Sequence, residues 1–525
     1  AIDFGTTNTH IEYSVDGSTS SNPFDITEKD MQIQKLHITD DYMINDVFNS
    51  DFIPATIGGE SLYGYPMRTV ISESNNTNWD KAVLAMANVN IPYTYEKSLS
   101  LPYNVLHTDL KWSTNTEDKK RASKYIESIL LMLRTKVLLN NGDLSKTEIV
   151  WFYPASMTQN RFNKFKAEWE NTFATLFGAP ISNIIAASES VAPYYYHKAK
   201  KGATSTVVSV DIGGGTTDVL IVDKGEPKYL TSFRFAANTI FGDGYSYDSD
   251  SNGFVNKYKD IITNQLETNN LRGLKAVLKS VLDKRVSTDV IAFLFSLASN
   301  KEIKKEKVEI NFAKMLADDN RGKYVVILFY VAIVYHIAQL MKAKGFDMPR
   351  HMTFSGNGSK VLNILSTNDA TLVRLTKIIF EEIYAQSYSI DGLDIIRPAN
   401  SKESTCKGGI ILTPFQSQDY GEIKDMKTIL IGTDNEKFAD VHMTYNDVTE
   451  ADLDSVVDVI KEYIEFTFKL DKKFSFYDNF DVDRSIMNKV KDLCYRDIRT
   501  YLENGLAIKK SEIAQDGADD NLEET

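Results

Sequence analysis

The sequence predicts an α/β fold in which two similar halves precede an α+β C-terminal extension. Predicted strands alternate with predicted helices through most of the chain, which is typical of α/β proteins. A strand, a glycine turn and a second strand occur at residues 1–15 and again at residues 206–222. Beyond residue 415 the pattern changes to a predicted strand pair at 425–448 and then a helix.

The stretch "VSVDIGGGTTDVLIV" at residues 208–222 predicts a hairpin with an unusual turn. β-branched runs on both sides indicate two strands. Consecutive glycines allow a close backbone approach, and the flanking acids and hydroxyls suit a polyphosphate with its divalent cation. An ordinary glycine-rich hairpin is the alternative. The residues of interest are Asp211, Gly213, Gly214, Gly215, Thr216, Thr217 and Asp218.

A similar turn near the start of the chain favours the phosphate interpretation. "AIDFGTTNTHIEYSV" again has an aspartate, one residue, a glycine turn, paired threonines and a second strand. Two such halves facing each other would place two phosphate-binding hairpins across one cleft. The residues of this first turn are Asp3, Gly5, Thr6, Thr7 and Asn8.

Composition narrows the class of protein. The chain has 525 residues, 42% hydrophobic and 25% charged, which is ordinary for a globular protein. A formal net charge of -13 disfavours non-specific binding to nucleic acid or anionic membranes. Two distant cysteines, Cys406 and Cys494, indicate neither a disulfide scaffold nor a zinc site. Since no signal peptide is visible either, we expect a cytoplasmic protein.

The remaining elements follow from periodicity and end signals. Residues 51–71 predict a hairpin around Gly58 and Gly59, and 148–154 predict a strand. Amphipathic helices are predicted at 118–142 and 159–178, with further helices through 254–317. Residues 325–341 are apolar enough to approach a membrane span, but His336 favours a buried core helix. Thr449 with Asp452 predicts a capped helix start.

Several ordered motifs resemble one family. "IDFGTTNT" and "VDIGGGTTDV" resemble the two phosphate motifs of the actin-like ATPase superfamily. "AASESVAPYYY" and "STCKGGIIL" resemble its two connecting segments, and "FSGNGSKVLNI" its adenosine motif. The resemblance covers residues 1 to about 415 and is greatest to the nucleotide-binding domain of DnaK-type 70-kDa heat-shock chaperones.

This resemblance implies a two-lobed, duplicated ribonuclease H-like fold. Lobe I would comprise residues 1–198, and lobe II residues 199–404. Residues 405–525 would supply the second connecting helix, which returns to lobe I, and an extension of unknown role.

The family's roles carry over onto matching positions. Asp3 and Asp211 would hold Mg²⁺, largely through waters, between the phosphate-binding turns. Asp218 and Glu189 would position the attacking water, and Lys111 would neutralise the γ-phosphate; a solvated Glu189 and a surface Lys111 are the alternatives. The expected contacts to adenosine and the nearby turn are Gly356, Asn357, Gly358, Ser359 and Gly242. Asn357 interrupts the family's glycine pair.

The implied activity is that of a slow, Mg²⁺-dependent ATPase switch that binds ATP and ADP. Protein clients or co-regulators are expected as partners, whereas nucleic acid and a membrane span are not. No peptide-binding sandwich follows the matched region, in contrast to the chaperones. The alternatives are an actin-like filament protein, a sugar kinase, and a module that binds nucleotide without hydrolysing it.

Overall fold

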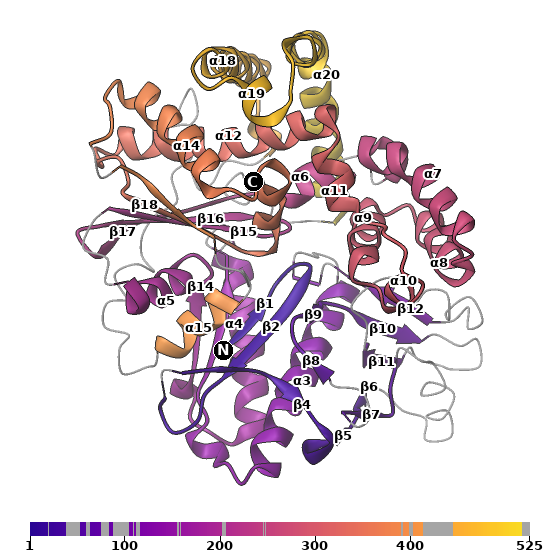
Figure 1. Cartoon of the computed structure of the whole chain (residues 1–525). Helices are drawn as coiled ribbons and strands as arrows, with labels where there is room; N and C mark the ends of the chain where they lie inside the picture. The colour runs from indigo at the N-terminus through magenta and orange to yellow at the C-terminus, as the bar shows by residue number, and fades with distance from the viewer. Residues whose placement is uncertain are drawn as a thin grey trace.

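The computed structural model is a mixed α/β protein with several mixed sheets (Figure 1). The two largest sheets lie one above the other in Figure 1, with helices between and around them. The described residues are 1–18, 20–37, 53–58, 63–74, 83–87, 104–108, 110–111, 116–154, 157, 159–201, 206–244, 246, 248–389, 392–397, 403–412 and 445–516.

The first sheet has the strand order β14-β13-β1-β2-β3, with β9 also paired to β2. Strands β14, β13 and β1 are parallel, whereas β2 runs antiparallel to its neighbours. Its strands are β1 (Ile2–Phe4), β2 (Asn8–Tyr13), β3 (Asn22–Pro23), β9 (Met67–Arg68), β13 (Ile149–Tyr153) and β14 (Ile184–Ser188). The predicted first hairpin is confirmed.

The second sheet repeats this arrangement with the order β19-β18-β15-β16-β17. Strands β19, β18 and β15 are parallel, and β16 is antiparallel to both of its neighbours. In both sheets three consecutive strands are followed along the chain by two parallel ones on the other side of the first, so the repeat seen in the sequence extends to sheet topology. The strands are β15 (Val207–Ile212), β16 (Thr217–Asp223), β17 (Glu226–Phe233), β18 (His351–Ser355) and β19 (Asp394–Ile396).

The prediction of a hairpin within residues 51–71 is wrong. The strands there pair with earlier segments, β7 with β5 and β8 with β4, rather than with each other. A four-stranded sheet of order β12-β10-β11-β6 lies beside them. These strands are β4 (Asp25–Ile26), β5 (Gln32–Ile33), β6 (Leu36–His37), β7 (Thr56–Ile57), β8 (Tyr63–Gly64), β10 (Ile71–Ser74), β11 (Val83–Met86) and β12 (Asn104–His107). Gly59 lies outside the described residues.

Two helices cover the outer face of the first sheet, as predicted. They are α3 (Thr116–Leu139) and α4 (Gln159–Phe177), and their buried side chains join one hydrophobic cluster with the sheet. Trp151 on β13 stacks on Trp169 of α4, with ring centroids 5.5 Å apart. Both rings are fully buried, so this stack fixes α4 against the sheet.

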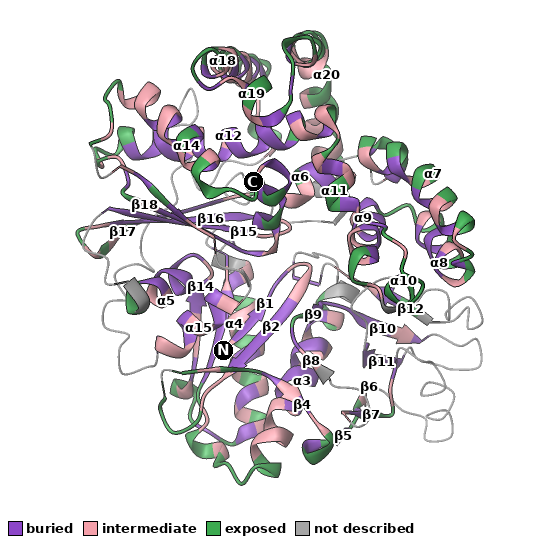
Figure 2. Cartoon of the chain, viewed as in Figure 1, coloured by how far each residue is buried: buried purple, intermediate pink, exposed green. Residues whose placement is uncertain are grey.

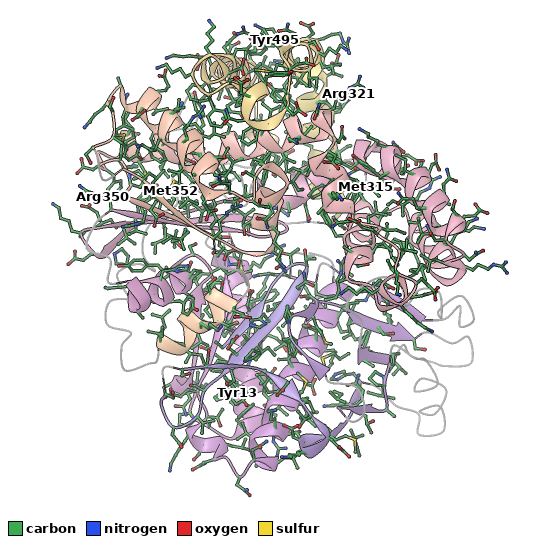
Figure 3. The ribbon with its side chains drawn as sticks, in the orientation of Figure 1. Tyr13, Met315, Arg321, Arg350, Met352 and Tyr495 are labelled. Carbon is green, nitrogen blue, oxygen red and sulfur yellow. The ribbon has the colours of Figure 1, made fainter. Side chains whose placement is uncertain are left out.

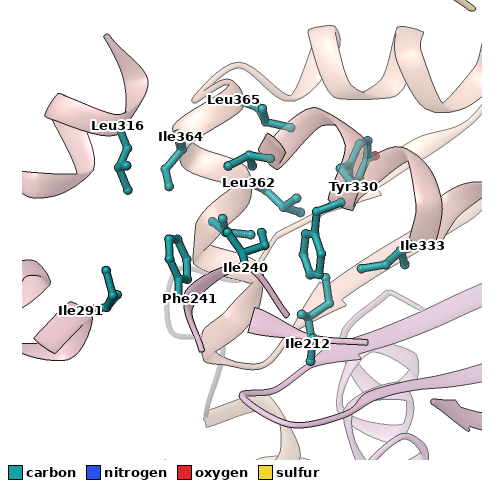
Figure 4. Close-up of a cluster of buried hydrophobic side chains, with 14 of the residues drawn as sticks. Ile212, Ile240, Phe241, Ile291, Leu316, Tyr330, Ile333, Leu362, Ile364 and Leu365 are labelled. Carbon is teal, nitrogen blue, oxygen red and sulfur yellow. The ribbon is translucent and has the colours of Figure 1, made fainter. Parts of the chain in front are cut away.

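A larger cluster fills the region above the second sheet (Figures 2 and 4). All six residues of β15 are buried, because helices cover both of its faces. Among the helices that contribute are α6 (Ala237–Phe241), α7 (Gly253–Thr268), α8 (Arg272–Asp283), α9 (Ser287–Ser296), α10 (Lys301–Lys305), α11 (Phe312–Ala317), α12 (Asn320–Ala343), α13 (Leu362–Leu365) and α14 (Asp369–Tyr384).

Helix α12 is the apolar helix noted in the sequence. By length and composition alone it could cross a membrane, yet 67% of its most apolar window is buried inside the protein. Thirteen of its residues are buried, among them Tyr330 and Ile333 in Figure 4. In this structure α12 therefore packs within the hydrophobic core.

Helices α5 (Val191–Lys201) and α15 (Glu403–Ile411) lie between the two large sheets (Figure 1). Val191 and Tyr194 pack on the second sheet, whereas Ala192 and Cys406 pack with strands of the first. Where α15 contacts α5, a Cβ atom on Gly408 would overlap the carbonyl oxygen of Ala192. Only glycine permits this separation.

The C-terminal part packs on the outer face of α12 and α14 through α18 (Glu450–Phe474), α19 (Phe476–Phe480) and α20 (Arg484–Asp516). Thr449 caps α18 as predicted: Asp452 Oδ2 accepts hydrogen bonds from the Thr449 amide and hydroxyl at 2.8 and 2.7 Å. Phe474 and Phe476 join the large core, so these helices belong to the same packed body. The predicted strand pair at 425–448 lies almost wholly outside the described residues.

The contact between α5 and α15 predicts a clear difference between two glycine substitutions. Gly408→Ala should lower the free energy of unfolding by about 1–3 kcal/mol, because the helices must separate to admit a methyl group. Gly253→Ala, at the start of α7, is the matched control, since its Cβ would meet no atom within 4 Å. Urea unfolding followed by circular dichroism measures both, and equal midpoints would refute the close contact.

His336 on α12 predicts how stability depends on pH. Its Nε2 is buried without a hydrogen-bond partner among the described residues, and burial lowers the pKa of His336 to about 4. In the unfolded chain His336 binds a proton as the pH falls below about 6.5, whereas in the folded protein it stays neutral until about pH 4. The free energy of unfolding therefore decreases as the pH falls from 6.5 to 4. Because His336→Leu lacks this group, we expect its free energy of unfolding to decrease by about 2–3 kcal/mol less than that of the native protein over this pH range.

Urea unfolding of the native protein and His336→Leu at pH 7.5 and 4.5 tests this prediction. His37, whose pKa burial also lowers to about 4, is present in both proteins and cancels in the comparison. Parallel pH profiles for the two proteins would show that His336 does not resist protonation.

Candidate functional site

The sequence-predicted residues gather at one edge of each large sheet. Gly5 follows β1 and Glu189 follows β14, while Gly213 follows β15 and Gly356 follows β18. These four strands end at the carboxyl edges of their sheets, where α/β proteins place their ligands. We define the first turn as residues 5–7 and the second turn as residues 213–216.

Backbone hydrogen bonds close the second turn and attach it to the short helix α6. The Gly213 amide donates to the Thr216 carbonyl at 2.9 Å. Amides at the start of α6 donate to the carbonyls of Gly213 and Gly214, at 3.2 and 2.8 Å. The Thr217 hydroxyl donates to the Phe235 carbonyl at 2.6 Å, so Thr217 supports the turn rather than offering its proton to a ligand.

The two turns meet tip to tip. A Cβ atom on Gly214 would lie only 2.5 Å from Oγ1 of Thr7. Residues 6–8 and 213–215 are half-buried, whereas the acids behind them, Asp3 and Asp211, are buried. The facing hairpins expected from the repeat are therefore present, with accessible backbone in front of two carboxylates.

A chain of hydrogen bonds that the sequence did not reveal supports the first turn. Tyr125 of α3 donates to Thr9 at 2.9 Å, the hydroxyls of Thr9 and Thr69 lie 2.9 Å apart, and Thr69 donates to the Gly5 carbonyl at 2.7 Å. The Thr69 amide also donates to the Thr7 carbonyl at 2.9 Å. Burial raises the pKa of Tyr125 well above its usual range, so it remains a neutral donor at the head of this chain.

Asp211 is held by residues from two distant segments. Its Oδ2 accepts hydrogen bonds from Ser355 at the end of β18, at 2.9 Å, and from Thr405 on α15, at 3.4 Å. Asp218 is its register partner on β16 and therefore shares its face of the sheet. The next residue of α15, Cys406, donates to the carbonyl of His10, at 3.4 Å.

Asp3 occupies the equivalent place in the first sheet. Its register partner is His10, and both side chains are buried. Because Cys406 contacts His10 and Thr405 contacts Asp211, the start of α15 joins the strands that carry the two acids.

The predicted adenosine motif lies against the second turn. Gly356 has a φ of +79°, and a Cβ there would lie 2.5 Å from Asp211 Oδ1 and overlap the Ile212 carbonyl. A Cβ on Gly358 would overlap the carbonyl of Gly213. Both glycines are thus required by contact with the turn. Ser359 donates to the Gly356 carbonyl at 2.7 Å, and Asn357 remains half-buried beside it.

Lys111 and Glu189 form an ion pair in the structure. Lys111 is 2% exposed and Glu189 is 14% exposed. Neither is the solvated surface residue considered as an alternative. The Glu189 amide donates to the carbonyl of Tyr153 at 3.0 Å, which fixes it at the carboxyl edge of the first sheet.

Gly242 lies apart from the other predicted residues. It ends α6, and its amide donates to the Asn238 carbonyl at 2.7 Å. A separate cavity is lined by Gly242 but by none of the residues of the first or second turn. It is joined to the second turn through α6, which is five residues long.

A buried ion pair joins the two halves on the far side of the site. Arg68, directly before Thr69, pairs with Asp289 on α9, and both side chains are buried. The residues are 221 positions apart, and no local pattern pointed to them. Removing either side chain would leave the charge of the other buried in a low-dielectric region without this ion pair, which is strongly unfavourable.

Within the described residues, no three His, Cys, Asp or Glu side chains lie close enough together to hold a metal ion.

Comparison of the chain with protein-family models and with curated proteins finds no match.

The contact between the turns predicts energetic coupling between Gly214 and Thr7. Gly214→Ala should cost about 1–3 kcal/mol through overpacking. In a Thr7→Ala background the nearest atom is removed and the next lie 3.6 Å and more away, so the cost should fall below about 1 kcal/mol. Unfolding free energies of the four proteins give the coupling.

Thr6→Ala provides the matched background for this cycle. Since Gly214 does not approach Thr6, Gly214→Ala should cost as much there as in the native protein. Equal costs in the Thr6→Ala and Thr7→Ala backgrounds would contradict the tip-to-tip arrangement.

Proposed function

We propose that this chain is an actin-like ATPase that binds Mg²⁺-ATP between its two halves and hydrolyses it slowly as a conformational switch. The observation that carries this proposal is the tip-to-tip contact of two glycine turns, each at the same position in one of two sheets of identical strand order. Facing hairpins present backbone amides from two sides, which suits a polyphosphate better than a single turn does.

Buried carboxylates behind the turns supply the metal site of this proposal. Asp3 and Asp211 offer the hard oxygen ligands that Mg²⁺ prefers, and the ion would complete its shell with water and phosphate oxygens. Ser355 and Thr405 fix the orientation of Asp211, because each donates a hydrogen bond to Oδ2. The fit therefore rests on the chemistry of these oxygen ligands and on their place directly behind the two turns.

The Lys111–Glu189 pair supports hydrolysis in addition to binding. A lysine beside the phosphates would stabilise the charge that spreads over the transferred group, and a carboxylate held by that lysine would orient a water. Asp218, on the same face as Asp211, is a second group for positioning water. Catalysis in this scheme consists of positioning and electrostatic stabilisation, with water as the acceptor.

Closure of the halves would be the output of the switch. Helices α5 and α15 form the contact between the sheets on one side, and Arg68–Asp289 forms it on the other. Nucleotide held by both turns would favour the closed arrangement, and its hydrolysis would release that preference. Protein clients or co-regulators would read this movement, as in the DnaK-type chaperones.

Single-turnover hydrolysis of ATP with Mg²⁺ tests the proposal. Glu189→Gln and Lys111→Met should retain nucleotide binding but slow cleavage about a hundredfold or more, since each removes an oriented charge. Asp211→Asn should weaken Mg²⁺-dependent binding itself. Glu226→Gln, an exposed acid on β17, is the matched control and should behave as native protein.

Three outcomes distinguish the alternatives. Binding without cleavage in native protein would indicate a nucleotide-binding module, and ATP-dependent light scattering that rises with concentration would indicate a filament protein. No binding of ATP or ADP to folded native protein would overturn the proposal.

A further inference from the structure

A cavity of about 770 Å³ lies away from the two turns, between the end of α6, the starts of α7 and α12, and the C-terminal helix α20. Figure 3 shows Arg321, one of its lining residues, beside the C-terminal helices. Cavities of this size are typical of small-molecule sites. None of its lining residues belongs to the turns, to the Lys111–Glu189 pair or to the adenosine motif.

The wall of this cavity combines apolar side chains with exposed backbone. Ile240, Phe254, Val325 and Tyr501 contribute the apolar part. Glycines at the end of α6 and at the start of α7 are half-buried or exposed, so a flat group can approach their backbone closely. The glycines are Gly242, Gly244 and Gly253.

The charged side chains of the wall are two acids and two cations. Asp319 is neutralised by Lys257 at 2.6 Å and accepts a hydrogen bond from Tyr258 at 2.9 Å. Asp243 accepts hydrogen bonds from the Ser287 amide, at 3.1 Å. Arg321 has no ion pair or side-chain hydrogen bond within the described part of the chain. Its exposed guanidinium is therefore available to a ligand.

We propose that this cavity binds a small organic anion with a planar, apolar body. The anionic group would pair with Arg321, whose guanidinium fork matches carboxylate, sulfonate or phosphate oxygens. The planar body would lie between Phe254, the glycine backbone and Tyr501, where aromatic rings contact each other favourably. This site is additional to the proposed nucleotide site and does not depend on it.

Tyr501 makes the C-terminal extension part of the binding site. Its ring is 61% exposed and comes from α20, whereas the rest of the wall comes from residues 239–325. A ligand in the cavity would therefore bridge the extension and the second half. This gives α20 a role beyond covering the core.

Fluorescence titration with 8-anilinonaphthalene-1-sulfonate, an aromatic anion, tests this inference on the full chain without nucleotide. Arg321→Gln and Tyr501→Ala should each weaken binding about tenfold, because each removes one side of the site. Lys323→Gln, a cation on the same helix outside the cavity, and Tyr477→Ala, a tyrosine 62% exposed, are the matched controls and should bind as native protein.

A blocking variant and an uncharged probe complete the experiment. Gly253→Phe should abolish binding, since a Cβ there meets no atom within 4 Å and the ring would occupy the cavity. N-phenyl-1-naphthylamine, which lacks the sulfonate, should bind with an affinity that Arg321→Gln does not change. The inference is overturned if the control variants weaken binding as much as Arg321→Gln and Tyr501→Ala do, or if Gly253→Phe, folded by circular dichroism, binds the sulfonate normally.

Discussion

The contact between Gly214 and Thr7 is the constraint on which the rest of the site depends. It requires a position without a side chain at the tip of one turn, where the Thr7 hydroxyl of the other turn lies. Each turn is then held from behind by its own half. Thr69 fixes the carbonyls of the first turn, and α6 fixes those of the second. The two halves are therefore aligned where the two turns meet and where both present accessible backbone.

Asp211 shows how distant segments converge on this place. It belongs to β15, and its carboxylate is oriented by Ser355 from β18 and Thr405 from α15. A side chain held by two hydroxyl donors keeps one orientation. The start of α15 also contacts the carbonyl of His10 opposite Asp3, so one helix joins the strands that carry the two acids.

Local patterns predicted the elements well where a single segment decided the outcome. Both hairpins, α3, α4, α12 and the Thr449 cap were readable because their strand alternation, helical periodicity or end signals lie within a few residues. The pairing of β7 and β8 was wrong, since short strands with similar patterns do not specify partners. Thr69, Thr405 and the Arg68–Asp289 pair were missed for the same reason: their roles exist only after distant segments meet. The Lys111–Glu189 pair was anticipated only as two separate residues.

The short helix α6 imposes a limit on how this protein can vary. One end is hydrogen-bonded to the second turn, and the other ends at Gly242. Substitutions along it change packing in the core shown in Figure 4, where Ile240 and Phe241 lie near Ile212 and Leu362. Inserting or deleting one residue would instead rotate everything beyond it by about 100° around the helix axis. Among related chains we therefore expect residues 237–241 to keep a constant length, while length changes accumulate in the loops beyond α7.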